Sequence, residues 1–165
     1  MKNNKYYRVY AEINLDAIVK NVDNLMALTK ENTGALAVVK ADGYGHGDVA
    51  VAKAVAQKVT GYAVATLDEA VNLRENGVKK PILVLGYVDP YEFDILVSHE
   101  ITATVFDVET AQLLADAARV QKKQAHCHIK VDTGMRRIGL EPDENGIAIV
   151  TVSYTHLRAH ETTLH

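Results

Sequence analysis

Residues 36–47 read LAVVKADGYGHG, a short aliphatic run that ends in a lysine and is followed by a loop with three glycines. The aliphatic run predicts a buried β-strand over residues 36–40. Four further strands are predicted at residues 62–66, 82–86, 102–106 and 126–131. Because these runs are largely apolar and do not alternate, they favour a parallel sheet that is covered on both faces.

Helical patterns fill the gaps between the predicted strands. Residues 18–28 carry one apolar stripe, and either Asn14 or Asp16 could cap the helix that contains it. Thr66 and Glu69 have the spacing of a capping box, which predicts a helix that begins after Thr66. The alternation of strand and helix indicates an α/β fold with right-handed crossovers. Two architectures stay open, a doubly wound sheet and a (β/α)8 barrel.

The composition excludes several classes of protein. The chain has 165 residues, is 48% hydrophobic and 24% charged, and carries a net charge of −3, which argues against a nucleic-acid binder that works by bulk electrostatics. A single cysteine, Cys127, excludes an internal disulfide framework. No apolar run approaches the ~20 residues that span a bilayer, and the first residues lack the apolar stretch of a signal peptide. We therefore expect a cytoplasmic enzyme or binding domain.

Lys40 stands at the end of the first predicted strand, where parallel α/β folds bind their ligands. A lysine amine at such an edge can attack a carbonyl carbon and form a Schiff base. In an arbitrary protein, a lysine at a strand end more often only extends into solvent. The glycines that follow do not match the GxGxxG dinucleotide motif, and the chain has no GxxxxGK[ST] motif.

The fifth predicted strand carries a second polar cluster. Period-two alternation places His126, His128, Lys130 and Asp132 on one face of this strand. Polar side chains that face into a sheet are costly unless they line a site. We disfavour zinc ligation by the two histidines, because no carboxylate or thiolate stands at a usable spacing, and we expect no metal.

Two adjacent arginines, Arg136 and Arg137, follow this strand in the segment TGMRRIG at residues 133–139. They are predicted to lie at the same edge of the sheet as Lys40. A guanidinium there suits a carboxylate or another anionic oxygen. Because adjacent residues point in different directions, one of the two arginines is expected to be solvated.

Two stretches resemble signatures of the alanine racemase family. Residues 38–47, VVKADGYGHG, resemble the family's pyridoxal-phosphate attachment motif, and residues 128–139, HIKVDTGMRRIG, resemble its second signature. Shorter matches lie at residues 11–18, 63–70 and 81–86, so that the resemblance runs from about residue 10 to about residue 146. It implies part of a (β/α)8 TIM barrel that binds pyridoxal phosphate, with about five of the eight βα units.

The resemblance also assigns roles to individual residues. It implies that Lys40 forms a Schiff base with pyridoxal phosphate and acts as one of two catalytic bases. Tyr44 would line the cofactor pocket, and Arg137 would contact the cofactor's phenolic oxygen and position the substrate carboxylate. Lys130 corresponds to a lysine that carries a carbamate in some members of the family. Arg136 stands where many members have glycine or another small residue.

The activity implied by the resemblance is the interconversion of L-alanine and D-alanine for bacterial cell-wall peptidoglycan. A relative that acts on serine is the nearest variant. The expected partners are a small amino acid as substrate and a second subunit in a homodimer, with no nucleic acid and no membrane. The alternative is a single-domain pyridoxal-phosphate homeostasis protein without racemase activity, which the loop after Lys40 and the MRRIG segment match less closely.

The end of the chain departs from the family pattern. The helical pattern expected after the fifth strand dissolves beyond Ile149, and three of the seven histidines fall within the last ten residues. We therefore expect residues 1–151 to be the N-terminal part of the barrel and residues 152–165 to be a non-native, adapter-derived tail. The family's C-terminal β domain, which carries the second catalytic base, would be absent and the chain alone inactive.

Overall fold

The computed structural model describes residues 9–158, with side chains described through residue 152. Five parallel strands form one sheet in the order of the chain: β1 (Leu36–Val38), β2 (Gly61–Val64), β3 (Ile82–Val84), β4 (Thr102–Val105) and β5 (His126–Ile129). A doubly wound sheet reverses its strand order at one point, whereas a (β/α)8 barrel does not. The architecture is therefore α/β and that of part of a TIM barrel, as the sequence predicted.

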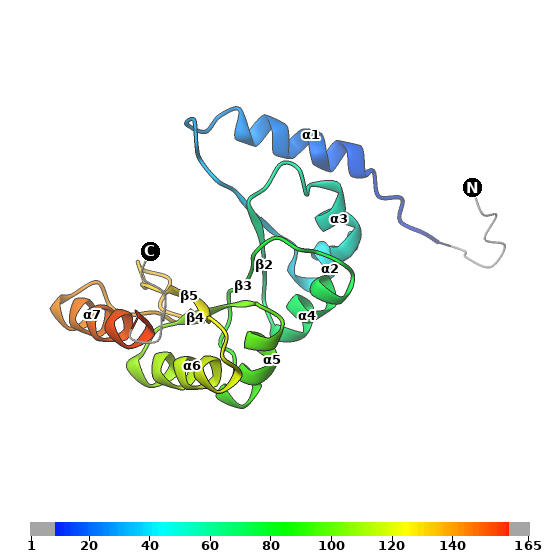
Figure 1. Ribbon diagram of the computed structural model, residues 1–165. Helices are drawn as coiled ribbons and strands as arrows, with labels where there is room; N and C mark the ends of the chain where they lie inside the picture. Colours follow the sequence, from blue (N-terminus) through cyan, green and yellow to red (C-terminus); the bar gives the residue numbers. More distant parts are fainter. Residues whose placement is uncertain (1–8, 159–165) are drawn as a thin grey trace.

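Helices connect the strands and form an arc along the sheet (Figure 1). They are α1 (Leu15–Met26), α2 (Lys40–Gly45), α3 (Asp48–Ala54), α4 (Leu67–Glu75), the short 3-10 helix η1 (Pro90–Glu92), α5 (Phe93–Ser98), α6 (Val108–Gln121) and α7 (Glu144–Arg158). Asn14 is the N-cap of α1, and Asp16 lies in its first turn. The predicted capping box is confirmed, since Thr66 and Glu69 exchange both of its hydrogen bonds.

The core lies between the helices and one face of the sheet. Alternate strand residues, among them Tyr62, Val64, Ile82 and Val84, are almost completely buried against helices. The expectation that both faces are covered is wrong for β1, because Leu36 and Val38 on the other face are 42% and 43% exposed. In a barrel this second face points to the interior, where side chains from other strands and not helices surround it.

The helix that follows β5 is longer than the sequence pattern indicated. Helix α7 begins at Glu144 and continues to Arg158, so the change of pattern after Ile149 does not end it. The apolar positions are irregular there, but the segment contains no proline and only one glycine, Gly146, to interrupt the helix. The division at residue 151 coincides with no helix end and stays a prediction. His160 and His165 lie outside the described residues.

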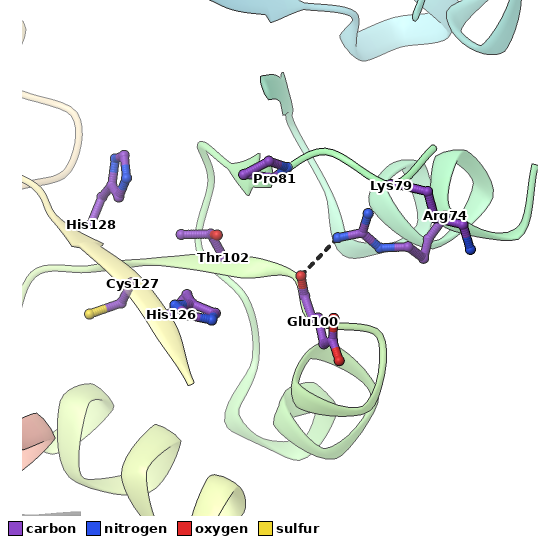
Figure 2. A pocket seen from close by; sticks show the side chains of 8 residues that line it. All are labelled: Arg74, Lys79, Pro81, Glu100, Thr102, His126, Cys127 and His128. Atoms are coloured by element: carbon purple, nitrogen blue, oxygen red, sulfur yellow. Dashed lines mark hydrogen bonds between the residues drawn. The ribbon is translucent and has the colours of Figure 1, made fainter. Parts of the chain in front are cut away.

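Arg74 of α4 ties together the loops at the amino ends of the strands. Its guanidinium donates hydrogen bonds to the carbonyl oxygens of Val78 (2.7 Å), Lys80 (3.0 Å), His99 (2.9 Å) and Glu100 (2.8 Å). Figure 2 shows the contact with Glu100. Desolvation by burial lowers the pKa of Arg74 from its ordinary value, which is far above neutral pH. Through these four hydrogen bonds, the Arg74 side chain joins the loops before β3 and β4 to helix α4.

Arg74→Ala should destabilise the protein by about 3 kcal/mol. Four carbonyl groups lose their charged donor, and water does not fully replace these hydrogen bonds. The control is Arg119→Ala, since Arg119 only pairs with Asp116 on the exposed side of α6 at 2.7 Å. Such a surface pair contributes less than about 0.5 kcal/mol. Urea unfolding of both variants measures the difference, and equal losses would contradict the structural role of Arg74.

Candidate active site

The segment that follows β1 is a left-handed turn. Within α2, the four residues from Ala41 to Tyr44 have φ values of 52°, 53°, 59° and 56°. Only one of the four, Gly43, is a glycine, and the left-handed conformation costs other residues roughly 1–2 kcal/mol each. Backbone strain of this kind persists only where surrounding contacts hold it, and it is concentrated at functional sites. The sequence predicted a glycine-rich loop here but not its handedness.

Backbone and side-chain hydrogen bonds hold this turn. The N–H of Gly43 donates to the carbonyl of Val39 at 2.9 Å, and that of Gly47 donates to the carbonyl of Asp42 at 2.8 Å. The Asp42 carboxylate also accepts the N–H of Asp48 at 3.1 Å. Gly43 is buried, and a Cβ there would lie 3.2 Å from the backbone nitrogen of Asp48. The turn therefore closes directly against the start of α3.

A cavity of about 370 Å³ lies at the carboxyl ends of the strands. Its walls come from the ends of β1, β2 and β3 and from the segment after β5. The lining residues are Lys40, Ala65, Leu85, Gly86, Lys130, Val131, Asp132, Thr133, Met135, Arg137 and Ile138. Three of the residues singled out in the sequence, Lys40, Lys130 and Arg137, thus line one cavity, although they come from opposite ends of the sheet.

The cavity carries an excess of positive charge. Within the described part of the chain, the side chains of Lys40, Lys130 and Arg137 form no hydrogen bond and no ion pair. Asp132 is the one acidic residue in the lining. Cationic groups without an anionic or hydrogen-bonding partner around one cavity are suited to an anionic ligand, since Arg and Lys bind carboxylates and phosphates.

The Asp132 carboxylate is occupied by the backbone of the loop that follows. It accepts the N–H groups of Gly134 at 2.8 Å, Arg136 at 3.0 Å and Arg137 at 3.1 Å. The N–H groups of Arg136 and Gly134 are the main reason that the pKa of Asp132 is lower than usual, and partial desolvation opposes them. Sequence alternation grouped Asp132 with the polar side chains of the fifth predicted strand, but its role in the loop was missed.

Two other predicted residues lie outside the lining of this cavity. Tyr44 is 61% exposed, and its ring centroid lies 6.0 Å from Nζ of Lys40. Arg136 is exposed and has a φ of 53°. Of the two adjacent arginines, the structure therefore brings only Arg137 to the cavity.

The two histidines of β5 lie near the other end of the sheet. His126 pairs with Thr102 and His128 with Thr104, and both imidazoles are exposed. They line a second pocket of about 340 Å³, shown in Figure 2, together with Arg74. Within residues 9–158 no group of three or more His, Cys, Asp or Glu side chains could hold a metal ion. Burial raises the pKa of the Cys127 thiol, so that it stays protonated at neutral pH.

Known proteins resemble this chain along most of its length. It is 45% identical over 144 residues to the alanine racemase of Desulforamulus reducens, covering 87% of this chain and 39% of that protein. It is 46% identical over 147 residues to alanine racemase 1 of Bacillus subtilis, covering 87% and 37%. The chain therefore spans about two fifths of the length of these curated relatives.

Solved structures are similar in fold as well. The alanine racemase of Clostridium difficile 630 superposes with a TM-score of 0.87 at 39% identity, covering 91% of this chain and 40% of that one. A histidine racemase from Leuconostoc mesenteroides superposes with a TM-score of 0.79 at 27% identity, covering 90% and 39%.

Residues 13–159 match the family model of the alanine racemase N-terminal domain. Within the described residues, no helix is long and apolar enough to cross a membrane. The matched range includes all five strands and the whole lining of the cavity at their carboxyl ends. The chain belongs to the alanine racemase family.

Proposed function

We propose that this chain supplies the cofactor lysine and the anion-binding cations of a racemase that uses pyridoxal phosphate to interconvert L-alanine and D-alanine. The observation that carries the proposal is the shared cavity of Lys40, Lys130 and Arg137 in a member of this family. Its D-alanine would serve cell-wall synthesis in the cytoplasm. We further propose that the active protein is a homodimer.

The residues present fit pyridoxal phosphate. The cofactor carries an aldehyde, a phenolic oxygen and a phosphate, which need an amine and cationic donors, and the cavity offers all of these types. Its wall also contains Gly86, where a Cβ would lie 2.6 Å from the carbonyl oxygen of Ala65. The absence of a side chain at this position lets the backbone segments after β2 and β3 pack closely in the wall.

When bound, pyridoxal phosphate withdraws electrons from the substrate's Cα and so makes its proton removable. Lys40 would hold the cofactor and then, as a free amine, take or return the proton on one face of Cα. Arg137 would bind an anionic oxygen of cofactor or substrate with its guanidinium. Lys130 lies in the same lining, where a carbamate on its amine would give Arg137 an anionic neighbour.

Asp132 would act on the site through Arg137. Its carboxylate gathers the N–H groups of residues 134, 136 and 137, and so sets the path of the loop between β5 and α7. Because the N–H of Arg137 is one of these donors, the carboxylate fixes where that side chain leaves the backbone. The loop thereby places Arg137, although exposed, in the lining of the cavity.

The exposed inner face of β1 bears on the activity of this polypeptide. On the sheet's inner face, Leu36 and Val38 of β1, the strand that leads to Lys40, are 42% and 43% exposed. Racemisation also needs an acid–base group on each face of Cα. We propose that the 165 residues by themselves do not racemise alanine, with residues 152–165 as a non-native tail. Measured turnover by this polypeptide would contradict that.

Lys40→Ala should abolish both alanine racemisation and the visible absorbance of lysine-bound pyridoxal phosphate, because the variant lacks the amine that we assign to the cofactor's aldehyde. The measurement uses the natural gene product that contains residues 1–151. Lys53→Ala, at an exposed position of α3, is the matched control and should keep both properties.

The outcomes separate the candidate functions. Cofactor absorbance that depends on Lys40, without turnover of alanine or serine, would favour the pyridoxal-phosphate homeostasis protein. Absorbance that persists in Lys40→Ala would refute the assignment of Lys40.

Asp132 should make the loop after β5 sensitive to acid. Its lowered pKa means that the folded state favours the ionised carboxylate. This contribution to stability is complete above the ordinary pKa of aspartate and is lost as the pH falls through the lowered value. In an NMR experiment, the chemical shift of the Gly134 amide proton should therefore change with pH, because it reports the ionisation of Asp132. Its midpoint should lie below the ordinary pKa of aspartate. The same signal should show no such transition in Asp132→Asn, and a midpoint at the ordinary value would contradict the role of these hydrogen bonds.

A further inference from the structure

Glu69 joins the ends of two neighbouring strands. One carboxylate oxygen accepts the N–H of Ala41 at 2.7 Å. Ala41 is the residue directly after Lys40. The other accepts the N–H groups of Ala65 at 2.7 Å and Thr66 at 3.3 Å, at the end of β2. A capping box accounts for the contact with Thr66 but not for the contact with Ala41, which lies 28 residues away in the chain.

The contact with Ala41 falls at the point where the backbone is strained. Ala41 is the first residue of the left-handed turn, with φ 52° and ψ 52°. Its N–H belongs to the peptide group that also contains the carbonyl of Lys40. A charge-assisted hydrogen bond to this N–H orients that peptide plane and helps offset the cost of the left-handed conformation.

The same carboxylate also faces the cavity wall. Ala65, which donates to the second oxygen, lines the cavity together with Lys40. Both oxygens of Glu69 are used by backbone N–H groups, so the side chain spans the gap between the turn after β1 and the wall formed by β2. The distance between these two segments is thereby held by one rigid, planar group.

We propose that Glu69 is a positioning residue for Lys40: it holds the peptide after Lys40 against the end of β2, so that the amine reaches the cofactor. This rests on the proposed function of Lys40. Glu69 does not itself touch the cofactor or the substrate. Its effect is transmitted through the backbone of Ala41, and it should therefore appear in how well Lys40 holds pyridoxal phosphate and in kcat.

Three variants test this in the holoenzyme of the natural gene product. Glu69→Gln keeps the shape but offers one acceptor oxygen, and its NH2 group would face a backbone N–H. Asp68→Asn is the matched control, because Asp68 is the exposed neighbouring carboxylate in the first turn of α4. Thr66→Ala removes the capping hydroxyl that accepts the N–H of Glu69 at 3.4 Å and leaves the contact with Ala41 in place.

In Glu69→Gln, the dissociation constant of pyridoxal phosphate, followed by visible absorbance, should rise about tenfold, the size of one lost charge-assisted hydrogen bond. The kcat should fall about 10- to 100-fold, as for a misplaced catalytic group, with KM for alanine changed less than about twofold. Asp68→Asn should match the parent. Thr66→Ala should lower thermal stability without changing cofactor affinity.

The proposal is overturned if Glu69→Gln binds the cofactor as tightly as Asp68→Asn does, or if Thr66→Ala reproduces its losses. Should Glu69→Gln not fold, Glu69→Asp replaces it, since the shorter side chain keeps the charge at the helix start but cannot reach both segments. The same cofactor and kinetic results are expected for it. Cofactor affinity is independent of the substrate, so a failure to racemise alanine would count against the proposed function and leave the role of Glu69 measurable.

Discussion

The parallel register of the strands is the constraint on which the site depends. Val38 lies opposite Ala63, Ala63 opposite Leu83, and Leu83 opposite Thr102, which pairs with His126. All strands therefore end at one edge of the curved sheet. Side chains far apart in the chain meet there, because every crossover returns the backbone to the same starting edge. The cavity is the consequence of this register.

Carboxylates that bind backbone N–H groups organise the two loops of the site. Glu69 holds the turn after β1, and Asp132 holds the loop after β5. Neither needs a cationic partner, because oriented N–H groups stabilise a carboxylate charge. The cations of the cavity thus remain available for a ligand. Hydrogen bonds outside the centre of the cavity hold both the left-handed turn after β1 and the loop after β5 in their conformations.

Local signals accounted for much of the fold. The strand runs and the capping box at Thr66 were predictable, and the cap of α1 was narrowed to Asn14 or Asp16, because periodicity and helix capping depend on residues close together in the chain. Alternation on β5 correctly placed His126 and His128 on one face, opposite to that of Cys127, but did not indicate that this face is exposed. The extent of α7 was mispredicted, since an irregular apolar pattern does not reveal where a helix ends when no strong breaker is present.

The sequence by itself determined the residue types of the site: a lysine at a strand end, a lysine and an aspartate directly after β5, and a pair of arginines beyond them. The sequence also predicted that the arginines lie at the same edge of the sheet as Lys40 and that one of them is solvated. The tertiary structure decided that Lys40, Lys130 and Arg137 line one cavity and that Arg136 lies outside it. It also decided the second role of Glu69, whose contact with Ala41 joins separate βα units. Local sequence restricts which conformations a segment can adopt, whereas contacts between distant segments exist only once the sheet has assembled.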